Sequence, residues 1–135
     1  MTIVTTSRKP VPEVRSLARD LAFALGCEYI VRGKQSIAQI AGRDPLVIHL
    51  SREGGKTRLQ LITGNQVVAD YLVRSERVEI RERTINQGIY SSNQSVYEHL
   101  RRYLPVVLAD TVQGTLAYDG IKRRHYELDM VPYGA

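Results

Sequence analysis

The chain has 135 residues, of which 43% are hydrophobic and 24% charged, so it is long enough to bury a core as a single domain. No apolar run approaches the roughly 20 residues of a membrane helix, and the N-terminal segment lacks the pattern of a secretory signal. The single cysteine cannot form an internal disulfide. We therefore expect a cytoplasmic protein with no membrane partner. Nineteen Lys and Arg residues against 14 Asp and Glu give a net charge of +5, which favours a polyanionic partner such as a nucleic acid.

The chain begins with a predicted strand and helix. Residues 3–5 indicate a short strand that runs into a turn. A helix begins near Pro12, because the fixed φ of proline suits a first helical turn, and Gly26 is well placed to end it. The apolar residues of this helix recur at helical spacing and predict a core-facing side made of Val14, Leu17, Ala18, Leu21 and Leu25.

The rest of the first half predicts three more strands and one brief helix. A strand at 28–31 is followed by a loop and by a helix at 36–41, with Ser36 as its N-cap. Strands at 46–50 and 58–62 then flank a segment centred on two glycines. This arrangement is typical of a β-hairpin.

The second half repeats this organisation less regularly. Ser95 and Glu98 have the spacing of a capping box, which predicts a helix that continues to Leu104 and ends at Pro105. The alternation of apolar and polar residues predicts four strands, at 67–73, 78–84, 115–118 and 125–131.

The chain therefore reads as a single α/β domain, residues 1–135, built from two similar halves. The first half spans about 1–64 and the second about 65–135. Each half offers strands around one main helix, although no residue-for-residue repeat connects them. There is no low-complexity linker between them, so one compact unit is favoured over two free domains.

The sequence lacks the usual patterns of catalytic and metal sites. Gly55-Lys56-Thr57 resembles the end of a phosphate-binding loop, but the glycine required five positions earlier is Leu50, and the segment joins two strands. The three histidines are far apart, and no Cys/His cluster has metal-ligand spacing. Cys27 has no adjacent base to activate it. We therefore expect neither an enzyme nor a metal or nucleotide cofactor.

Cations gather around the start of the first helix. Arg8 and Lys9 precede it directly, and a helix N-terminus offers free N–H groups and a partial positive charge to a phosphate. Thr5, Thr6 and Ser7 add hydroxyl donors. The alternative is that Thr6 or Ser7 only caps the turn and that the arginines are solvated. The full set of predicted cations is Arg8, Lys9, Arg15, Arg19, Arg32 and Lys34.

Three segments in this region resemble a known family. They are Ile3-Val-Thr-Thr-Ser-Arg-Lys-Pro10, Val14-Arg-Ser-Leu-Ala-Arg-Asp-Leu21 and Tyr29-Ile-Val-Arg-Gly-Lys34. In order and spacing they are similar to the N-terminal half of the Brix-domain family, and more narrowly to short archaeal proteins related to the Imp-four subunit of the small-subunit processome. The similarity covers about the first quarter of the chain, and beyond it only length and architecture match.

The resemblance implies both a fold and a function. The implied fold has two pseudo-symmetric α/β halves, each resembling the anticodon-binding domain of class II aminoacyl-tRNA synthetases. The implied role is in ribosome biogenesis, through binding precursor ribosomal RNA beside other assembly proteins. The family's basic motif falls on Ser7, Arg8, Lys9, Arg15, Arg32, Gly33 and Lys34. The segment Lys122-Arg-Arg-His-Tyr126 is similar to a longer basic segment of eukaryotic members, which makes Lys122, Arg123 and Arg124 a candidate second patch.

We therefore predict a protein that binds structured or single-stranded precursor rRNA through arginine–phosphate contacts, with Tyr29, Tyr118 and Tyr126 as candidates for base stacking. An alternative is a protein-interaction module whose second half docks other assembly factors through an apolar or β-edge surface. A third hypothesis, an anticodon-recognition fragment acting on tRNA, follows from fold analogy.

Overall fold

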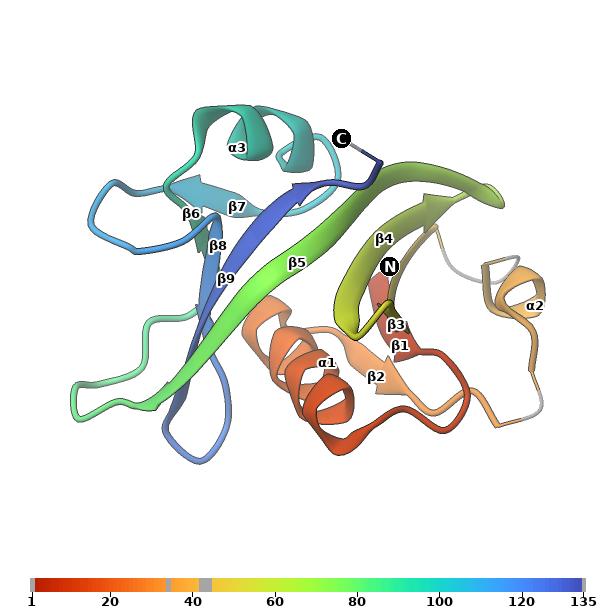
Figure 1. The fold of residues 1–135 in the computed structure, drawn as a ribbon, viewed down its shortest axis with the longest axis horizontal. Coiled ribbons are helices and arrows are strands. Elements are labelled where there is room, and N and C mark those ends of the chain that lie inside the picture. The colour runs from red at the N-terminus through yellow and green to blue at the C-terminus, as the bar shows by residue number, and fades with distance from the viewer. Residues whose placement is uncertain (1, 34, 42–44, 135) are drawn as a thin grey trace.

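The computed structural model describes residues 2–33, 35–41 and 45–134. These residues form a mixed α/β fold in which nine strands make one curled sheet and three helices pack against it (Figure 1). The elements are β1 (Thr2–Thr6), α1 (Pro12–Leu25), β2 (Glu28–Ile30), α2 (Ile37–Ala41), β3 (Leu46–Glu53), β4 (Lys56–Thr63), β5 (Gln66–Ile80), β6 (Ile89–Ser91), α3 (Gln94–Leu100), β7 (Val106–Leu108), β8 (Leu116–Asp119) and β9 (Arg124–Pro132).

The long strand β5 occupies the centre of the sheet, whose order is β2-β1-β3-β4-β5-β9-β8-β6-β7. Its first part pairs with β4 through Gln66–Val73, and its second part pairs with β9 through Tyr71–Ile80. Both ends of the sheet carry a parallel strand pair joined by a helix, β1–α1–β2 at one end and β6–α3–β7 at the other. Figure 1 shows β5 crossing the molecule between these two ends.

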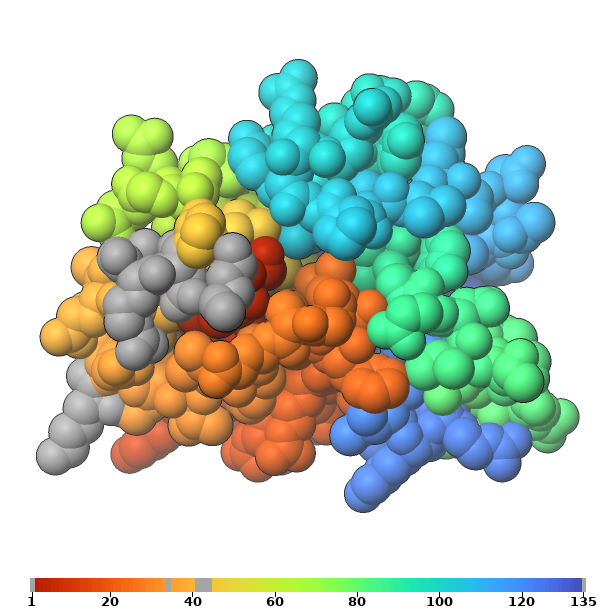
Figure 2. Space-filling view, turned by 180° about the vertical axis from the view of Figure 1, so that it is seen from behind, coloured from red at the N-terminus to blue at the C-terminus, as the bar shows by residue number. Residues whose placement is uncertain are grey.

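Helix α1 is the main helix of the first half, and the structure confirms the prediction of its bounds. Pro12 occupies the first turn, and Gly26 ends the helix in the left-handed conformation, with φ of 69°. In that conformation the N–H groups after the helix reach the carbonyls of Ala22 and Phe23. Seen from behind, α1 (deep orange) lies at the surface, with the segment after it (light orange) on one side and the turn between β8 and β9 (blue) on the other (Figure 2).

Strand β1 and the first part of β3 bury both of their faces. One face, with Val4 and Ile48, belongs to a large core that also holds the apolar sides of α1 and α3. The opposite face, with Ile3 and Val47, packs with Ile40 of α2 in a smaller cluster. Because neighbouring residues of a strand point to opposite faces, the apolar pairs Ile3-Val4 of β1 and Val47-Ile48 of β3 each serve both clusters.

Two predictions about the second half are wrong. The strands expected at 67–73 and 78–84 are one strand that ends at Ile80, because a bulge between Val73 and Ser75 lets β5 continue along β9 instead of turning back. Asn93, and not Ser95, caps α3: its side-chain oxygen accepts a hydrogen bond from the Val96 N–H at 3.0 Å. The helix accordingly begins at Gln94, two residues before the start that a Ser95 cap implies, and it ends at Leu100 instead of Leu104. The short strands β6 and β7 were not predicted.

Candidate nucleic-acid interface

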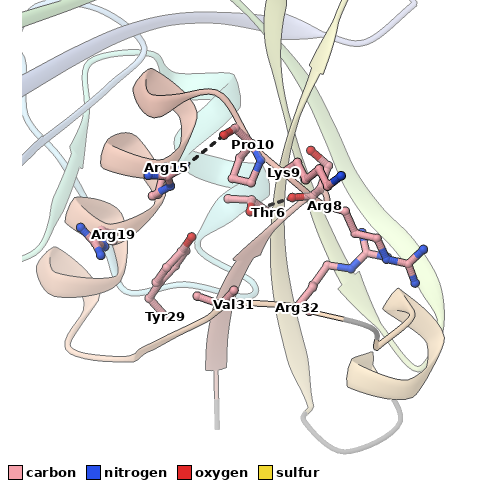
Figure 3. Close-up of a pocket in the computed structure, with 11 residues that line it drawn as sticks. Thr6, Arg8, Lys9, Pro10, Arg15, Arg19, Tyr29, Val31 and Arg32 are labelled. Carbon is pink, nitrogen blue, oxygen red and sulfur yellow. Dashed lines mark hydrogen bonds between the residues drawn. The ribbon is translucent and has the colours of Figure 1, made fainter.

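A pocket of about 470 Å³ opens where β1 and β2 end and α1 begins (Figure 3). We call it the basic pocket. Its lining comes from the turn after β1, from one side of α1 and from the end of β2 with the loop that follows. The lining residues are Thr6, Ser7, Arg8, Lys9, Pro10, Arg15, Arg19, Tyr29, Val31, Arg32 and Gly33.

Parallel pairing of β1 with β2 brings these distant segments together. Val4 lies opposite Tyr29 and Thr5 opposite Ile30, so the two strands end at the same edge of the sheet. The buried Thr5 hydroxyl donates a hydrogen bond to the Ile30 carbonyl at 2.6 Å, which holds this register. The loop containing Arg32 therefore lies beside the turn after β1, although about 25 residues separate them in sequence.

The turn between β1 and α1 leaves the helix N-terminus without a side-chain cap. Val11 is the N-cap residue and its side chain makes no capping hydrogen bond. The Thr6 hydroxyl donates instead to the Ser7 carbonyl at 3.0 Å, so it stabilises the turn and does not cap α1. Lys9 has a positive φ of 51°, which helps the chain reverse direction before the helix. The N-cap residue of α1 therefore supplies no side-chain acceptor to the first N–H groups of the helix.

The basic pocket gathers positively charged side chains from three segments of the chain. Among the described residues, no Asp or Glu lines the pocket, and no ion pair reaches Lys9, Arg15, Arg19 or Arg32. Arg15 and Arg32 donate instead to backbone carbonyls, at 3.4 and 3.3 Å. Desolvation by burial, together with repulsion from Arg8, lowers the pKa of Arg32. An anion entering the pocket would relieve this repulsion.

The structure brings together most of the residues predicted for the site. Ser7, Arg8, Lys9, Arg15, Arg19, Arg32 and Gly33 all line the basic pocket. Lys34 lies outside the described residues. Sequence reasoning missed Val31, whose side chain is 75% exposed at the pocket although it directly follows a strand. An apolar residue at a strand end gives no signal in sequence that distinguishes it from the core.

The three tyrosines proposed for base stacking have different surroundings. Tyr29 is half-buried and lines the basic pocket. Tyr118 and Tyr126 are buried and stack on each other, with ring centroids 4.9 Å apart. Their hydroxyls donate to the Leu17 carbonyl and to the Asp20 carboxylate. The prediction of base stacking is therefore wrong for Tyr118 and Tyr126, because both rings belong to the core.

The candidate second patch is divided by the structure. Lys122 and Arg123 are exposed in the turn between β8 and β9, both with left-handed φ values. Arg124 points inward and holds the fully buried Asp20 of α1, with Nε–Oδ2 and Nη2–Oδ1 distances of 2.7 and 3.2 Å. Its partner Asp20 also accepts from the backbone N–H of Ile121. Arg124 therefore has a structural role, and only Lys122 and Arg123 remain in the patch.

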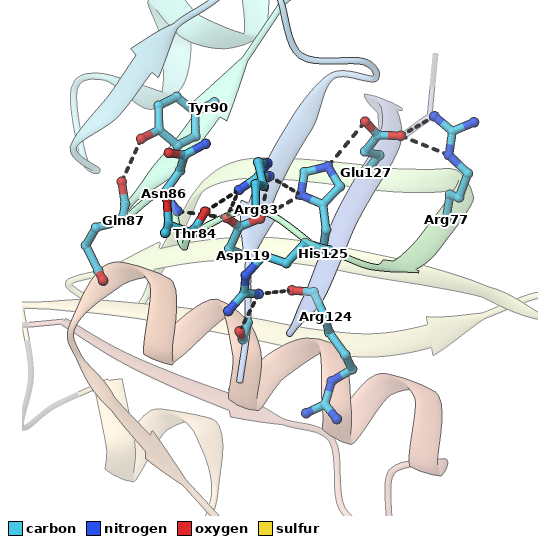
Figure 4. Close-up of polar contacts among 12 residues, drawn as sticks. Arg77, Arg83, Thr84, Asn86, Gln87, Tyr90, Asp119, Arg124, His125 and Glu127 are labelled. Atoms are coloured by element: carbon cyan, nitrogen blue, oxygen red, sulfur yellow. Dashed lines mark hydrogen bonds and ion pairs between the residues drawn. The ribbon is translucent and has the colours of Figure 1, made fainter. Parts of the chain in front are cut away.

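Arg77, Arg83 and His125 of the second half contact carboxylates. Figure 4 shows a chain of contacts that runs from Arg77 through Glu127, His125 and Asp119 to Arg83. Burial of Asp119 opposes its ionisation, but hydrogen bonds from Arg83, a backbone N–H and His125 outweigh this effect and lower its pKa to about 2. The charged side chains of this group are thus paired with one another, whereas no ion pair among the described residues reaches Lys9, Arg15, Arg19 or Arg32.

The part of the chain that is described holds neither a group of metal-ligating side chains nor a membrane-spanning helix. Within it, no three His, Cys, Asp or Glu side chains are grouped to hold a metal ion. No helix within it is long and apolar enough to cross a membrane.

These observations define a small mixed α/β protein with one curled sheet and a cation-lined pocket at the ends of two parallel strands. No known family profile matches the chain. It is 29% identical over 82 residues to a probable Brix domain-containing ribosomal biogenesis protein of Methanothermobacter thermautotrophicus, a match that covers 59% of this chain and 53% of the relative. The match thus spans about half the length of that relative.

A solved structure shares the fold over nearly the whole chain. The crystal structure of an archaeal Imp4-like protein matches with a TM-score of 0.65, covering 98% of this chain and 99% of that one, at 16% sequence identity. Together the two comparisons confirm the resemblance to the Brix-domain family that the first quarter of the sequence indicated.

Proposed function

We propose that this protein acts in ribosome biogenesis by binding precursor ribosomal RNA through the basic pocket, and that it holds an RNA fold or pairing while assembly proceeds. The observation that carries the proposal is the convergence of cations from three chain segments on one pocket, with no Asp or Glu among the described residues that line it. The description of the archaeal relative as a ribosomal biogenesis protein supports the general role.

The chemistry of the pocket suits a phosphate chain. An arginine guanidinium forms two parallel hydrogen bonds to one phosphate, whereas a lysine ammonium acts as a point charge. Arg15 and Arg19 extend the pocket along α1. Among the described residues no carboxylate pairs with Lys9, Arg15, Arg19 or Arg32, so these side chains can bind a phosphate without breaking an ion pair there.

The two-halved organisation is part of this proposal. The halves, about 1–64 and 65–135, would be two versions of one α/β unit, each resembling the anticodon-binding domain of class II aminoacyl-tRNA synthetases. The placing of β1–α1–β2 and β6–α3–β7 at opposite ends of the sheet supports this division. The halves also differ, because β3 runs parallel to β1 whereas β8 runs antiparallel to β6. We assign RNA contact chiefly to the first half, because Arg77 and Arg83 of the second half are paired with the carboxylates of Glu127 and Asp119.

A salt titration of binding to precursor rRNA fragments tests the proposal. If the protein neutralises several phosphates, log affinity should fall with log salt by about 0.7 to 0.9 per contact. Replacing Arg8 and Lys9 together with alanine should weaken binding several-fold without unfolding the domain. An affinity that ignores salt would refute phosphate binding, and an unchanged affinity of the double variant would move the site elsewhere.

A protein-docking role remains the second candidate because the sheet ends in an exposed apolar strand. Val107 and Leu108 of the edge strand β7 are 51% and 42% exposed. Such an edge can pair with a strand of another assembly factor. This role predicts complexes that survive high salt, whereas RNA complexes should dissociate.

Competition between tRNA and rRNA fragments for the free protein separates the third hypothesis, recognition of tRNA, from the first, binding of precursor rRNA.

A further inference from the structure

We infer that the basic pocket holds one unpaired nucleotide of single-stranded RNA, with its base against the ring of Tyr29 and its phosphates on the surrounding arginines. This inference rests on the proposed function and narrows it, because it excludes a double helix as the ligand of this pocket.

The first argument is that the pocket is not built from cations alone. Tyr29, Val31 and Pro10 contribute carbon surface to its lining, and Val31 is 75% exposed there. A site for phosphate alone has no use for an aromatic ring and aliphatic side chains, which do not interact with an anion. A nucleotide has both an anionic and a flat, weakly polar part, and it matches both kinds of lining.

The second argument concerns the rigidity and position of Tyr29. Its ring packs against the large core, and its backbone is held in β2 opposite Val4 of β1. Figure 3 shows the ring extending from β2 toward Arg15, with Arg19 on one side and Thr6 on the other. The Tyr29 hydroxyl makes no hydrogen bond to any described residue. A ring that is already fixed loses little conformational entropy when a base stacks on it.

The third argument is one of shape. The pocket has a volume of about 470 Å³, within the range of roughly 300 to 1,000 Å³ typical of small-molecule sites. An RNA double helix presents phosphates on a convex surface and keeps its bases stacked inside, so no base reaches a recess. A single strand can turn one base out of its stack. Since every base has an aromatic face, we expect little preference among the four bases.

Fluorescence anisotropy with a labelled oligouridine of about ten nucleotides, alone and paired with its complement, tests the inference. Tyr29→Leu removes the ring, and Tyr29→Phe keeps it. Tyr97→Leu is the matched control, because Tyr97 is also half-buried against the large core but lies on α3, outside the pocket lining. Thermal unfolding establishes that each variant is folded.

At equal salt, we expect the single strand to bind more tightly than the duplex. Tyr29→Leu should weaken single-strand binding roughly fivefold to a hundredfold and leave the salt dependence unchanged, while the Phe variant and the Tyr97 control bind like the unaltered protein. Equal affinity for both RNAs, or no effect of Tyr29→Leu, would overturn the inference and leave salt-dependent RNA binding standing. Tighter binding of an acidic phosphopeptide than of the oligouridine would also overturn it. Absence of salt-dependent binding to any RNA would instead overturn the proposed function.

Discussion

Replacing Asp20 with alanine should destabilise the protein by about 3 kcal/mol, because this carboxylate connects α1 to the second half of the chain. The side chain is fully buried. It accepts hydrogen bonds from two nitrogens of Arg124, from the Tyr126 hydroxyl and from the Ile121 N–H. Loss of one partner of a buried ion pair typically costs about 3–5 kcal/mol. We take the lower end, since the Arg124 side chain is 24% exposed and water can replace part of its interaction.

Chemical denaturation of the Asp20→Ala variant measures this loss, and a shift in Tm of roughly 10 °C should accompany it. Asp70→Ala is the control, because Asp70 also accepts two hydrogen bonds from one arginine, Arg58, at 2.9 and 2.6 Å. Both of those side chains are more than a fifth exposed, so this variant should lose at most about 1 kcal/mol. Equal losses in the two variants would refute the argument that burial makes the Asp20 contact strong.

Two further predictions concern the same region of the second half. The pKa of Asp119 falls from an ordinary 3.8 to about 2 in the folded protein, so the unfolded chain binds a proton first as the pH drops. The free energy of unfolding should therefore decrease by about 1 kcal/mol between about pH 6 and pH 3. Asp119→Asn should remove this share of the acid sensitivity. Identical acid dependence in both proteins would contradict it. A Cβ atom at Gly120 would overlap the Asp20 Cγ, so Gly120→Ala should displace that carboxylate. The free energy of unfolding, measured with denaturant, should fall by about 1–3 kcal/mol. An unchanged denaturation midpoint would show that Asp20 can move without cost.

In the first half of the chain, local signals in the sequence were sufficient to predict helix α1 and the hairpin between β3 and β4. The apolar spacing in α1, the proline in its first turn and Gly26 at its end define the helix without tertiary information. The glycine-centred hairpin between β3 and β4 is equally local, with Glu53 paired to Lys56. The basic pocket was also partly predictable, because most of its cations lie close together in the chain or on one side of a single helix.

Long-range pairing explains what the sequence could not show. Arg124 stands in a run of basic residues that is typical of a surface, and its partner Asp20 is 104 residues away. Tyr118 and Tyr126 likewise gave no sign that they would stack in the core. The bulge after Val73 also depends on β9, which lies about 50 residues further along the chain. In each case the deciding neighbour is brought close only by the complete sheet.

The most direct test of RNA binding by the basic pocket is the change in salt dependence when two of its arginines lose their charge. Arg15→Gln with Arg19→Gln should reduce the slope of log affinity against log salt by about 1.4 to 1.8 on a precursor rRNA fragment. The matched control replaces Arg101 and Arg102, two exposed arginines that directly follow α3 and lie outside the pocket lining, and should leave the slope unchanged. An equal reduction in both double variants, or an unchanged slope in the first, would contradict the assignment of phosphate binding to this pocket.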